Sequence, residues 1–305
     1  MVAMPEQRLA YLNARLLDPA SCRDEIGHVL IEDGLIAAVG PDIFPNRVPD
    51  RTEVIDLDGL CLAPGLVDMH ARIGEPGAEH KENLEAGMAG AALGGVTAIF
   101  EMPNTRPSAT TVAAIQDKLD RARGRAAIDH AFYVGAAAEN TRELAELELL
   151  PGVAGVKIFM GASTGNMLVD DPATLTAVFS RARLMVVTHC EDTPMILANE
   201  AAARERFGED VPFEQHPLIR SEAACYASTE LATGLAKQHG ARLHVLHLTT
   251  ARELAFFAAG PVADKRITVE ACVHHLYFDE SQYARRGADI KCNPAIKRAS
   301  DRTAL

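Results

Sequence analysis

The sequence predicts an α/β protein, a TIM-like (β/α)8 barrel preceded by a small N-terminal β-subdomain. From Pro64 onward, apolar segments of strand length alternate with helix-like segments, which is typical of a parallel sheet covered by helices. No glycine-rich dinucleotide-binding turn follows the first of these strands, so a barrel is favoured over an open sheet. We therefore expect a β-subdomain over residues 1–63, as part of a composite β-sandwich, and a barrel over residues 64–305.

The N-terminal part contains short apolar segments separated by turns. The predicted strands lie in AYLNARLLD, GHVLIEDGLIAAVG and EVIDLDGLCLAPG. The predicted turns are Glu32-Asp33-Gly34 and Asp58-Gly59, because Asp and Gly tolerate the backbone angles of tight turns.

The second part contains seven predicted strands where a closed barrel needs eight. The strands are 66–70, 97–102, 131–134, 155–159, 184–189, 243–247 and 267–272, with helices that include 79–93, 111–123, 194–207 and 221–239. The sequence ends at Leu305, in what is predicted to be the start of a helix. We therefore expect the last strand to be absent and the barrel to be C-terminally incomplete.

Composition and charge limit the classes of partner. The net charge is −12, which disfavours nucleic acid and anionic membrane surfaces. No apolar run reaches the ~18 residues of a membrane span, and the N-terminus lacks the features of a secretory signal. None of the six cysteines belongs to a CxxC pair, so we expect buried, reduced thiols in a cytoplasmic protein.

Polar residues recur where the predicted strands end. In a barrel these ends open onto one face, which is where active sites are built. A single strand-end histidine is usually structural, but several at equivalent positions predict a site. The residues are His70, Asn104, Lys157, His189, His247 and the pair His274 and His275.

Lys157 is the most informative of these residues, because an unpaired ammonium inside an apolar strand is costly. It requires a salt bridge, a Schiff base or conversion to a carbamate. Imidazoles together with a carboxylate-like oxygen suit Zn²⁺, which lowers the pKa of water towards ~7 and so supports amide hydrolysis. His244 and His247 are three residues apart and point to opposite faces of a strand. We therefore expect only one of them, His247, to face the site.

Nine ordered segments carry a family resemblance. They are APGLVDMH, GEPGAEHKE, GGVTAIFEMPNT, GVKIFMGASTGNMLVDD, THCED, HPLIRSEAACY, LHVLHLTTARE, EACVHHL and KCNPAIK. With these segments the chain resembles a dihydroorotase of the amidohydrolase superfamily, and MPNT and KIFMGASTGN are specific to dihydroorotases and near relatives.

The resemblance implies roles for individual positions. His70 fills the first place of the family's His-x-His metal pair, and Lys157 matches the carboxylated lysine that bridges two zinc ions. His189 and His247 match the ligands of the second metal. The resemblance also implies one or two Zn²⁺ ions, and a homodimer or a complex with aspartate transcarbamoylase.

Further positions match the substrate contacts of the family. Asn104 and Asn293 match side chains that hold the substrate ring and its carboxylate. The family's general base is an Asp after the eighth strand, which has no counterpart before Leu305, so the catalytic residue is unknown.

The chain departs from the family after the first barrel strand. The family motif is His-x-His-x-Arg-Glu-Pro-Gly, whereas this chain has Arg72 in place of the second His and Gly74 in place of the Arg. Arginine is permanently charged and cannot ligate zinc, so we expect the first metal position to be weak or empty. Arg72 is able to reach the substrate carboxylate that the lost Arg would have held.

Three hypotheses follow. The first is an active dihydroorotase, which hydrolyses dihydroorotate reversibly to N-carbamoyl-aspartate in de novo pyrimidine biosynthesis. The second is a catalytically inactive homologue kept as a structural partner of aspartate transcarbamoylase. The third is a hydantoinase-like or allantoinase-like cyclic amidase, which needs no carboxylate clamp.

Overall fold

The computed structural model describes residues 8–161 and 167–305. The chain divides into two compact units, Met1–Leu66 and Val67–Leu305. This division falls close to the boundary after residue 63 that the sequence pattern suggests. No helix within the described ranges is long and apolar enough to cross a membrane.

The first unit is a five-stranded sheet with the order β3-β2-β1-β4, in which β5 also pairs with β1. β1 is antiparallel to β2 and parallel to β4 and β5. The predicted turn at Asp33-Gly34 is confirmed, because both residues have positive φ (51° and 80°), as this type of hairpin requires. The strands are β1 Arg8–Asp18, β2 Arg23–Glu32, β3 Leu35–Gly40, β4 Thr52–Asp56 and β5 Cys61–Leu62.

The second unit contains the predicted alternation of strands and helices. Its seven strands form one curled sheet in the order β12-β11-β10-β9-β8-β7-β6, the sequence order of a barrel. The fold class predicted from the sequence is therefore confirmed. The strands are β6 Leu66–Ala71, β7 Val96–Glu101, β8 Asp129–Gly135, β9 Val153–Phe159, β10 Met185–His189, β11 Leu243–Val245 and β12 Ile267–Val269.

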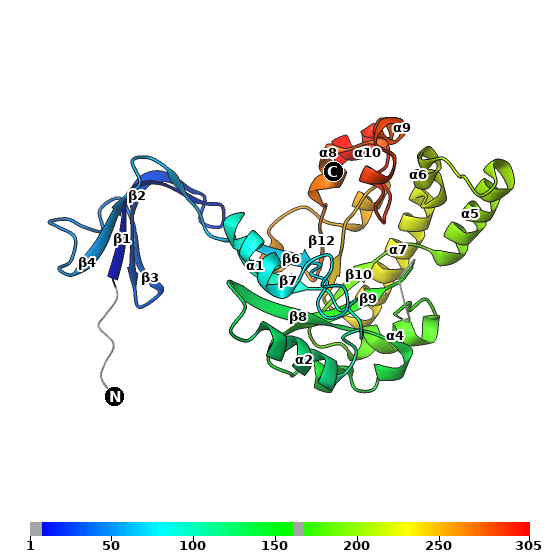
Figure 1. Cartoon of the computed structure of the whole chain (residues 1–305), viewed down its shortest axis with the longest axis horizontal. Helices are drawn as coiled ribbons and strands as arrows, with labels where there is room; N and C mark the ends of the chain where they lie inside the picture. The colour runs from blue at the N-terminus through cyan, green and yellow to red at the C-terminus, as the bar shows by residue number, and fades with distance from the viewer. Residues whose placement is uncertain (1–7, 162–166) are drawn as a thin grey trace. The chain divides into compact units, whose positions relative to one another are not determined.

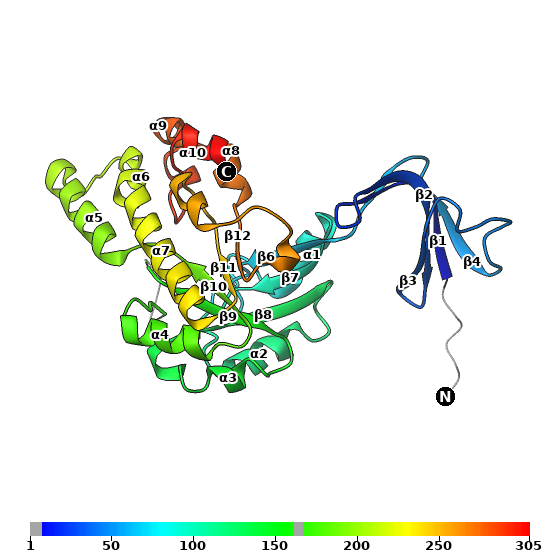
Figure 2. The same ribbon diagram turned by 180° about the vertical axis from the view of Figure 1, so that it is seen from behind.

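Helices α2, α4 and α7 lie along one side of this sheet in both views (Figures 1 and 2). Helix α1 starts at Leu84 and not near Glu79 as expected, because Asn83 caps it by accepting from the Ala86 N–H. The helices are α1 Leu84–Leu93, α2 Val112–Ala122, α3 Leu144–Leu147, α4 Pro172–Arg181, α5 Thr193–Phe207, α6 His216–Ile219, α7 Glu222–His239, α8 Val273–Tyr277, α9 Tyr283–Arg286 and α10 Ala299–Ala304.

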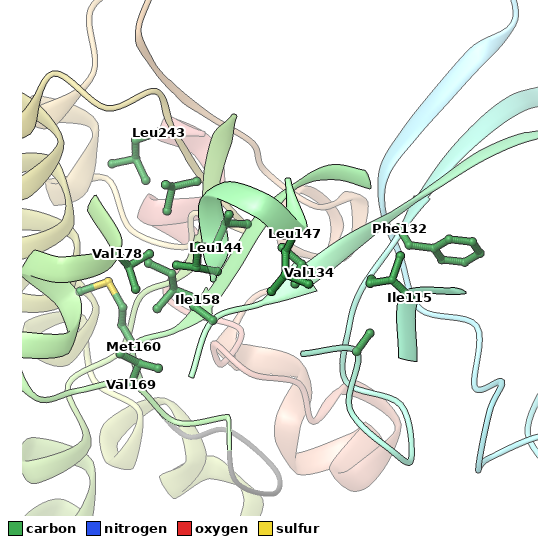
Figure 3. Packing of buried hydrophobic residues seen from close by; sticks show 14 of the residues in the cluster. Ile115, Phe132, Val134, Leu144, Leu147, Ile158, Met160, Val169, Val178 and Leu243 are labelled. Carbon is green, nitrogen blue, oxygen red and sulfur yellow. The ribbon is translucent and has the colours of Figure 1, made fainter. Parts of the chain in front are cut away.

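The core lies between the sheet and these helices. Val134 and Ile158 of the sheet and Leu144 and Val178 of the helices are fully buried, and Figure 3 shows their side chains packed into one cluster. Burying each such side chain contributes about 1.5–3 kcal/mol. One face of the strands thus packs against the helices. The side chains on the other face are left available for a functional site.

The last two strands are shorter than the sequence predicts. β11 ends at Val245 and β12 at Val269, whereas the predicted strands extend to His247 and Cys272. His247 has a positive φ of 40°, which breaks the extended conformation. The polar residues expected at the ends of these strands therefore lie on irregular backbone just beyond them.

Candidate metal centre

Lys157 lies in the middle of β9 and is fully buried. Its neighbours Val156 and Ile158 belong to the core cluster, so Lys157 points to the opposite face of the sheet. Its Nζ has no hydrogen-bond partner and lies 4.5 Å from the centroid of the Phe159 ring. Burial, and then the charge of Arg72, hold the pKa of Lys157 well below its usual value, which favours the neutral form of the amine.

His189 and His247 face each other beside this amine. His189 Nδ1 lies 3.0 Å from His247 Nε2, and His247 Nδ1 is buried without a partner. Burial lowers the pKa of His189 to about 4 and that of His247 well below its usual value. Two neutral imidazoles thus place His189 Nδ1 and His247 Nε2 close enough for both to bind one ion. Zinc–nitrogen bonds of 2.0–2.1 Å in a tetrahedral site separate two ligand nitrogens by about 3.3 Å.

Glu191 and Arg220 hold His189 in place. His189 Nε2 lies 2.7 Å from Glu191 Oε2, and Arg220 Nη2 lies 2.8 Å from the same oxygen. Because a carboxylate can only accept, His189 Nε2 carries the hydrogen and Nδ1 keeps its lone pair. Outer partners of this kind orient metal-binding histidines. Sequence reasoning missed both residues, although they lie in the quoted segments THCED and HPLIRSEAACY.

His70 lies at the end of β6, with both ring nitrogens already engaged. Nδ1 is 2.5 Å from Glu270 Oε1, and Nε2 is 3.2 Å from Arg72 Nη2. Since arginine only donates, Nε2 is the acceptor and Nδ1 donates to Glu270. The lone pair that a metal ion would need therefore accepts a hydrogen bond from the Arg72 guanidinium. The centroids of the His70 and His247 rings are 5.3 Å apart, so this pair borders the two facing imidazoles.

Glu270, the first residue after β12, was not among the predicted site residues. Burial raises its pKa, but hydrogen bonds from His244 and His70 outweigh this effect and hold the pKa well below its usual range. The sequence offered only one signal for it, which is its position as an acidic residue at the start of EACVHHL, directly after an apolar strand.

Of His244 and His247, only His247 contacts His189, but both residues contact Glu270, although strict alternation would point their side chains to opposite faces. His244 Nε2 lies 3.3 Å from Glu270 Oε2, and the backbone N–H of His247 donates to Glu270 Oε1 over 3.3 Å. Strict alternation fails because β11 ends at Val245 and His247 leaves the extended conformation.

The two predicted substrate asparagines lie in loops, one after β7 and one before α10. Asn104 is half-buried in the loop after β7. Asn293 is exposed and lines a cavity of 320 Å³ together with Arg220, His216 and Lys291. Between described residues, no hydrogen bond joins either asparagine to Lys157 or to the facing histidines. Residues 162–166 of the segment KIFMGASTGN lie outside the described part of the chain.

The cysteines are free thiols, but only two of the six are buried as expected, and Cys272 and Cys292 are half-buried. Cys22 and Cys61 are exposed, whereas Cys190 and Cys225 are buried. Strands β1 to β5 form a small sheet whose buried core is limited to a few residues, so neither of the two exposed cysteines is covered.

The donor set fits one metal ion better than two. Lys157, His189 and His247, which we call the candidate centre, include two buried polar atoms without a partner. A buried polar atom without a partner is costly, and an ion held by Lys157 would remove that cost at its Nζ. At His70, by contrast, the Arg72 cation occupies the lone pair of Nε2.

The chain is similar to known proteins over most of its length. Residues 59–252, more than half of the chain, match the family model described as dihydro-orotase-like. The chain belongs to this family. A dihydroorotase of Solibacter usitatus is 31% identical over 303 residues, and one of Mycobacterium tuberculosis is 32% identical over 287 residues. These matches cover 96% and 91% of this chain.

Other relatives in this family carry different names. An allantoinase of Escherichia coli O1:K1 is 32% identical over 281 residues, which are 88% of this chain and 60% of the relative. An L-hydantoinase structure from Arthrobacter aurescens superposes with a TM-score of 0.87 at 25% identity, covering 97% of this chain and 65% of that one. The chain spans 66% of the length of the Solibacter and Anaplasma phagocytophilum dihydroorotases.

Proposed function

We propose that this protein is a cytoplasmic, zinc-dependent dihydroorotase, which hydrolyses the cyclic amide of dihydroorotate reversibly to N-carbamoyl-aspartate in de novo pyrimidine biosynthesis. The observation that carries the proposal is Lys157, a fully buried amine without a hydrogen-bond partner beside two facing neutral imidazoles. Family membership supports it, since the relatives that match most of the chain include proteins named dihydroorotase.

In this proposal the candidate centre holds one Zn²⁺. When bound, zinc lowers the pKa of water and polarises a carbonyl, which is the chemistry that amide hydrolysis needs. Glu191 keeps His189 in the tautomer with a free Nδ1, and the low pKa of both histidines keeps them unprotonated at neutral pH.

Lys157 contributes as a carbamate. A neutral amine attacks CO₂, the new N–C bond forms, and one proton leaves to solvent, so the product carries one negative charge. This anion supplies the oxygen donor that the two histidines lack. The buried position of Lys157 favours the reaction, because it lowers the pKa of the amine and so favours the unprotonated nitrogen that attacks CO₂.

Arg72, Asn104 and Asn293 bind the substrate in this proposal. Arg72 is exposed and its guanidinium carries a fixed positive charge near His70, so it attracts the substrate carboxylate. Asn293 and Arg220 line the same cavity, which offers an amide and a cation to a polar ring.

The test is zinc quantitation together with turnover of dihydroorotate, hydantoin and allantoin by the purified protein. We expect bound zinc and preferential turnover of dihydroorotate, with both lost in Lys157→Met and retained in Lys237→Met, which alters an exposed lysine of α7. A carbamate signal in ¹³C NMR after labelling with ¹³C-bicarbonate should disappear in the same variant. Zinc content near zero in the wild type would contradict the proposal.

A second candidate is a catalytically inactive homologue that acts as a structural partner of aspartate transcarbamoylase. It is favoured by Arg72 and Gly74, which replace the family's metal ligand and carboxylate clamp. Co-purification with aspartate transcarbamoylase in the absence of turnover would support it. A homodimer without that partner would favour the first candidate.

A third candidate is a cyclic amidase acting on a neutral ring. Gly74 favours it, since a neutral ring needs no arginine clamp, and the relatives named allantoinase and hydantoinase agree with it. Turnover of hydantoin or allantoin but not of dihydroorotate would establish this candidate in place of the first.

A further inference from the structure

A second group of metal-ligating side chains lies beyond β12, at the start of α8. Cys272, His274 and His275 each offer one ligand atom, and these atoms all lie within 4.8 Å of one another. The spacing is held locally, because the His275 N–H donates to the Cys272 carbonyl over 2.9 Å. None of the three residues belongs to the candidate centre.

The surroundings of His275 leave one of its ring nitrogens available to bind a metal ion. It is 4% exposed, and its Nε2 lies 3.2 Å from the Pro294 carbonyl oxygen. Because that oxygen only accepts, Nε2 carries the hydrogen and Nδ1 keeps the lone pair. Nδ1 is buried and has no partner. A backbone carbonyl that fixes the tautomer of a ligand histidine is a frequent outer partner in metal sites.

A neighbouring group of similar residues does not offer the same free donors. His70, Glu270 and Cys272 also place their ligand atoms within 4.8 Å of one another. However, His70 donates from Nδ1 to Glu270 and accepts at Nε2 from Arg72. No lone pair of His70 is free, and the guanidinium repels a second cation. The group that includes His275 is therefore the better site.

We propose that Cys272, His274 and His275 bind a divalent ion of the zinc type, separately from the candidate centre. One thiolate and two imidazoles are ligands that Zn²⁺ prefers, and three protein ligands leave a fourth position for water or another small ligand. His274 is half-buried, which gives the ion a path from solvent. The ion would join the end of β12 to the segment around Pro294.

Cobalt(II) provides a test that is independent of catalysis. The full chain is stripped of metal and titrated with Co²⁺, and its absorption is recorded in the near-ultraviolet. A cobalt–thiolate bond gives a charge-transfer band there, whereas ligation by nitrogen and oxygen alone does not. We expect the band in the wild type, its loss in Cys272→Ser, and one bound equivalent fewer in that variant and in His275→Gln.

Matched variants separate this site from its surroundings. Cys61→Ser removes an exposed thiol and should keep the band. Cys292→Ser should also keep it, although Cys292 Sγ lies 3.7 Å from His275 Nε2. Lys157→Met should keep the band while losing the ion of the candidate centre, so failure of the proposed function and failure of this site are distinguishable.

Three results would overturn the proposal: a wild type without the band, a band that persists in Cys272→Ser, or a band lost in Cys292→Ser alone. If Cys272→Ser does not fold, as judged by its thermal unfolding, His274→Gln replaces it. That change alters a half-buried side chain and should remove the same equivalent of metal.

Discussion

At the scale of single residues, Arg72 marks the departure of this chain from the family pattern. Its guanidinium donates to His70 Nε2, while His70 Nδ1 pairs with Glu270. A permanent cation thus engages the lone pair that a metal ion would use, and it repels an ion placed there. Arg72 and His70 together explain why we propose one ion at the candidate centre.

Arg72→His should restore a second position for metal. The change frees His70 Nε2 and adds an imidazole two residues along the chain. We expect the variant to bind one more equivalent of zinc per chain than its parent, measured by elemental analysis after dialysis. Arg72→Gln removes the cation without adding a ligand and should show no gain. Equal zinc content in the two variants would refute this explanation.

Arg220→Met tests the support of His189. Glu191 is fully buried and Arg220 is 9% exposed, so the change leaves a carboxylate without its counter-ion. Breaking a buried pair in this way costs about 3–5 kcal/mol, and loss of an outer partner weakens metal affinity about 10–100-fold. Chemical denaturation and competitive zinc titration measure the two effects.

The control for this change is Arg123→Met, since the Arg123–Asp120 pair is largely exposed. It should alter the free energy of unfolding by about 1 kcal/mol or less. If the two arginine variants are equally stable, the Arg220–Glu191 pair does not support the centre.

At the scale of elements, β9 sets the position of Lys157 against its neighbours. Lys157 pairs with Val187 of β10, and Gly155 pairs with Met185. A Cβ on Gly155 would lie 2.5 Å from the Met185 carbonyl oxygen. The glycine therefore permits the close approach of β9 and β10 that brings Lys157 beside His189.

Gly155→Ala should separate these two strands. Overpacking of this kind costs about 1–3 kcal/mol, so we expect a lower free energy of unfolding and weaker zinc binding. Gly90→Ala is the matched control, because nothing lies within 4 Å of a Cβ at that position in α1. Alanine there should be neutral or should stabilise by up to about 1 kcal/mol. Equal stability of both variants, measured by denaturant unfolding, would contradict the close approach.

At the scale of the whole molecule, burial keeps several histidines neutral. It lowers the pKa of His189 to about 4 and that of His275 to about 3, from an ordinary value of 6.5. Between these values the unfolded chain binds protons that the folded chain does not. The stability that these groups contribute is therefore present above pH 6.5 and is lost as the pH falls below it.

We expect His189 and His275 together to account for about 3 kcal/mol of the stability that the metal-free chain loses between pH 7.5 and 5.5, because each contributes about 1.4 kcal/mol over that range. Denaturant unfolding in the presence of a chelator measures it. His275→Gln should reduce the loss by about 1.4 kcal/mol, whereas His80→Gln, which alters an exposed side chain, should leave it unchanged. An increase in stability on acidification would contradict the assignment.

Many features of this molecule can be predicted from local sequence patterns without the tertiary structure. Apolar runs of strand length, the helix-like segments between them and the Asp33-Gly34 turn predict the alternation of elements, because the period of the side chains fixes which face is buried. The ordered segments from APGLVDMH to KCNPAIK predict the family. Lys157 could be singled out from sequence because a charged side chain inside an apolar strand is costly wherever it lies.

Only the tertiary structure decided which polar groups meet. Glu191 and Arg220 are 29 positions apart and Glu270 is 200 positions from His70, so no local pattern links them. Glu270 also meets His244, which lies 26 positions away in the sequence. The physical reason is that hydrogen bonds and ion pairs depend on distances of about 3 Å, which the folded backbone sets and the order of residues does not.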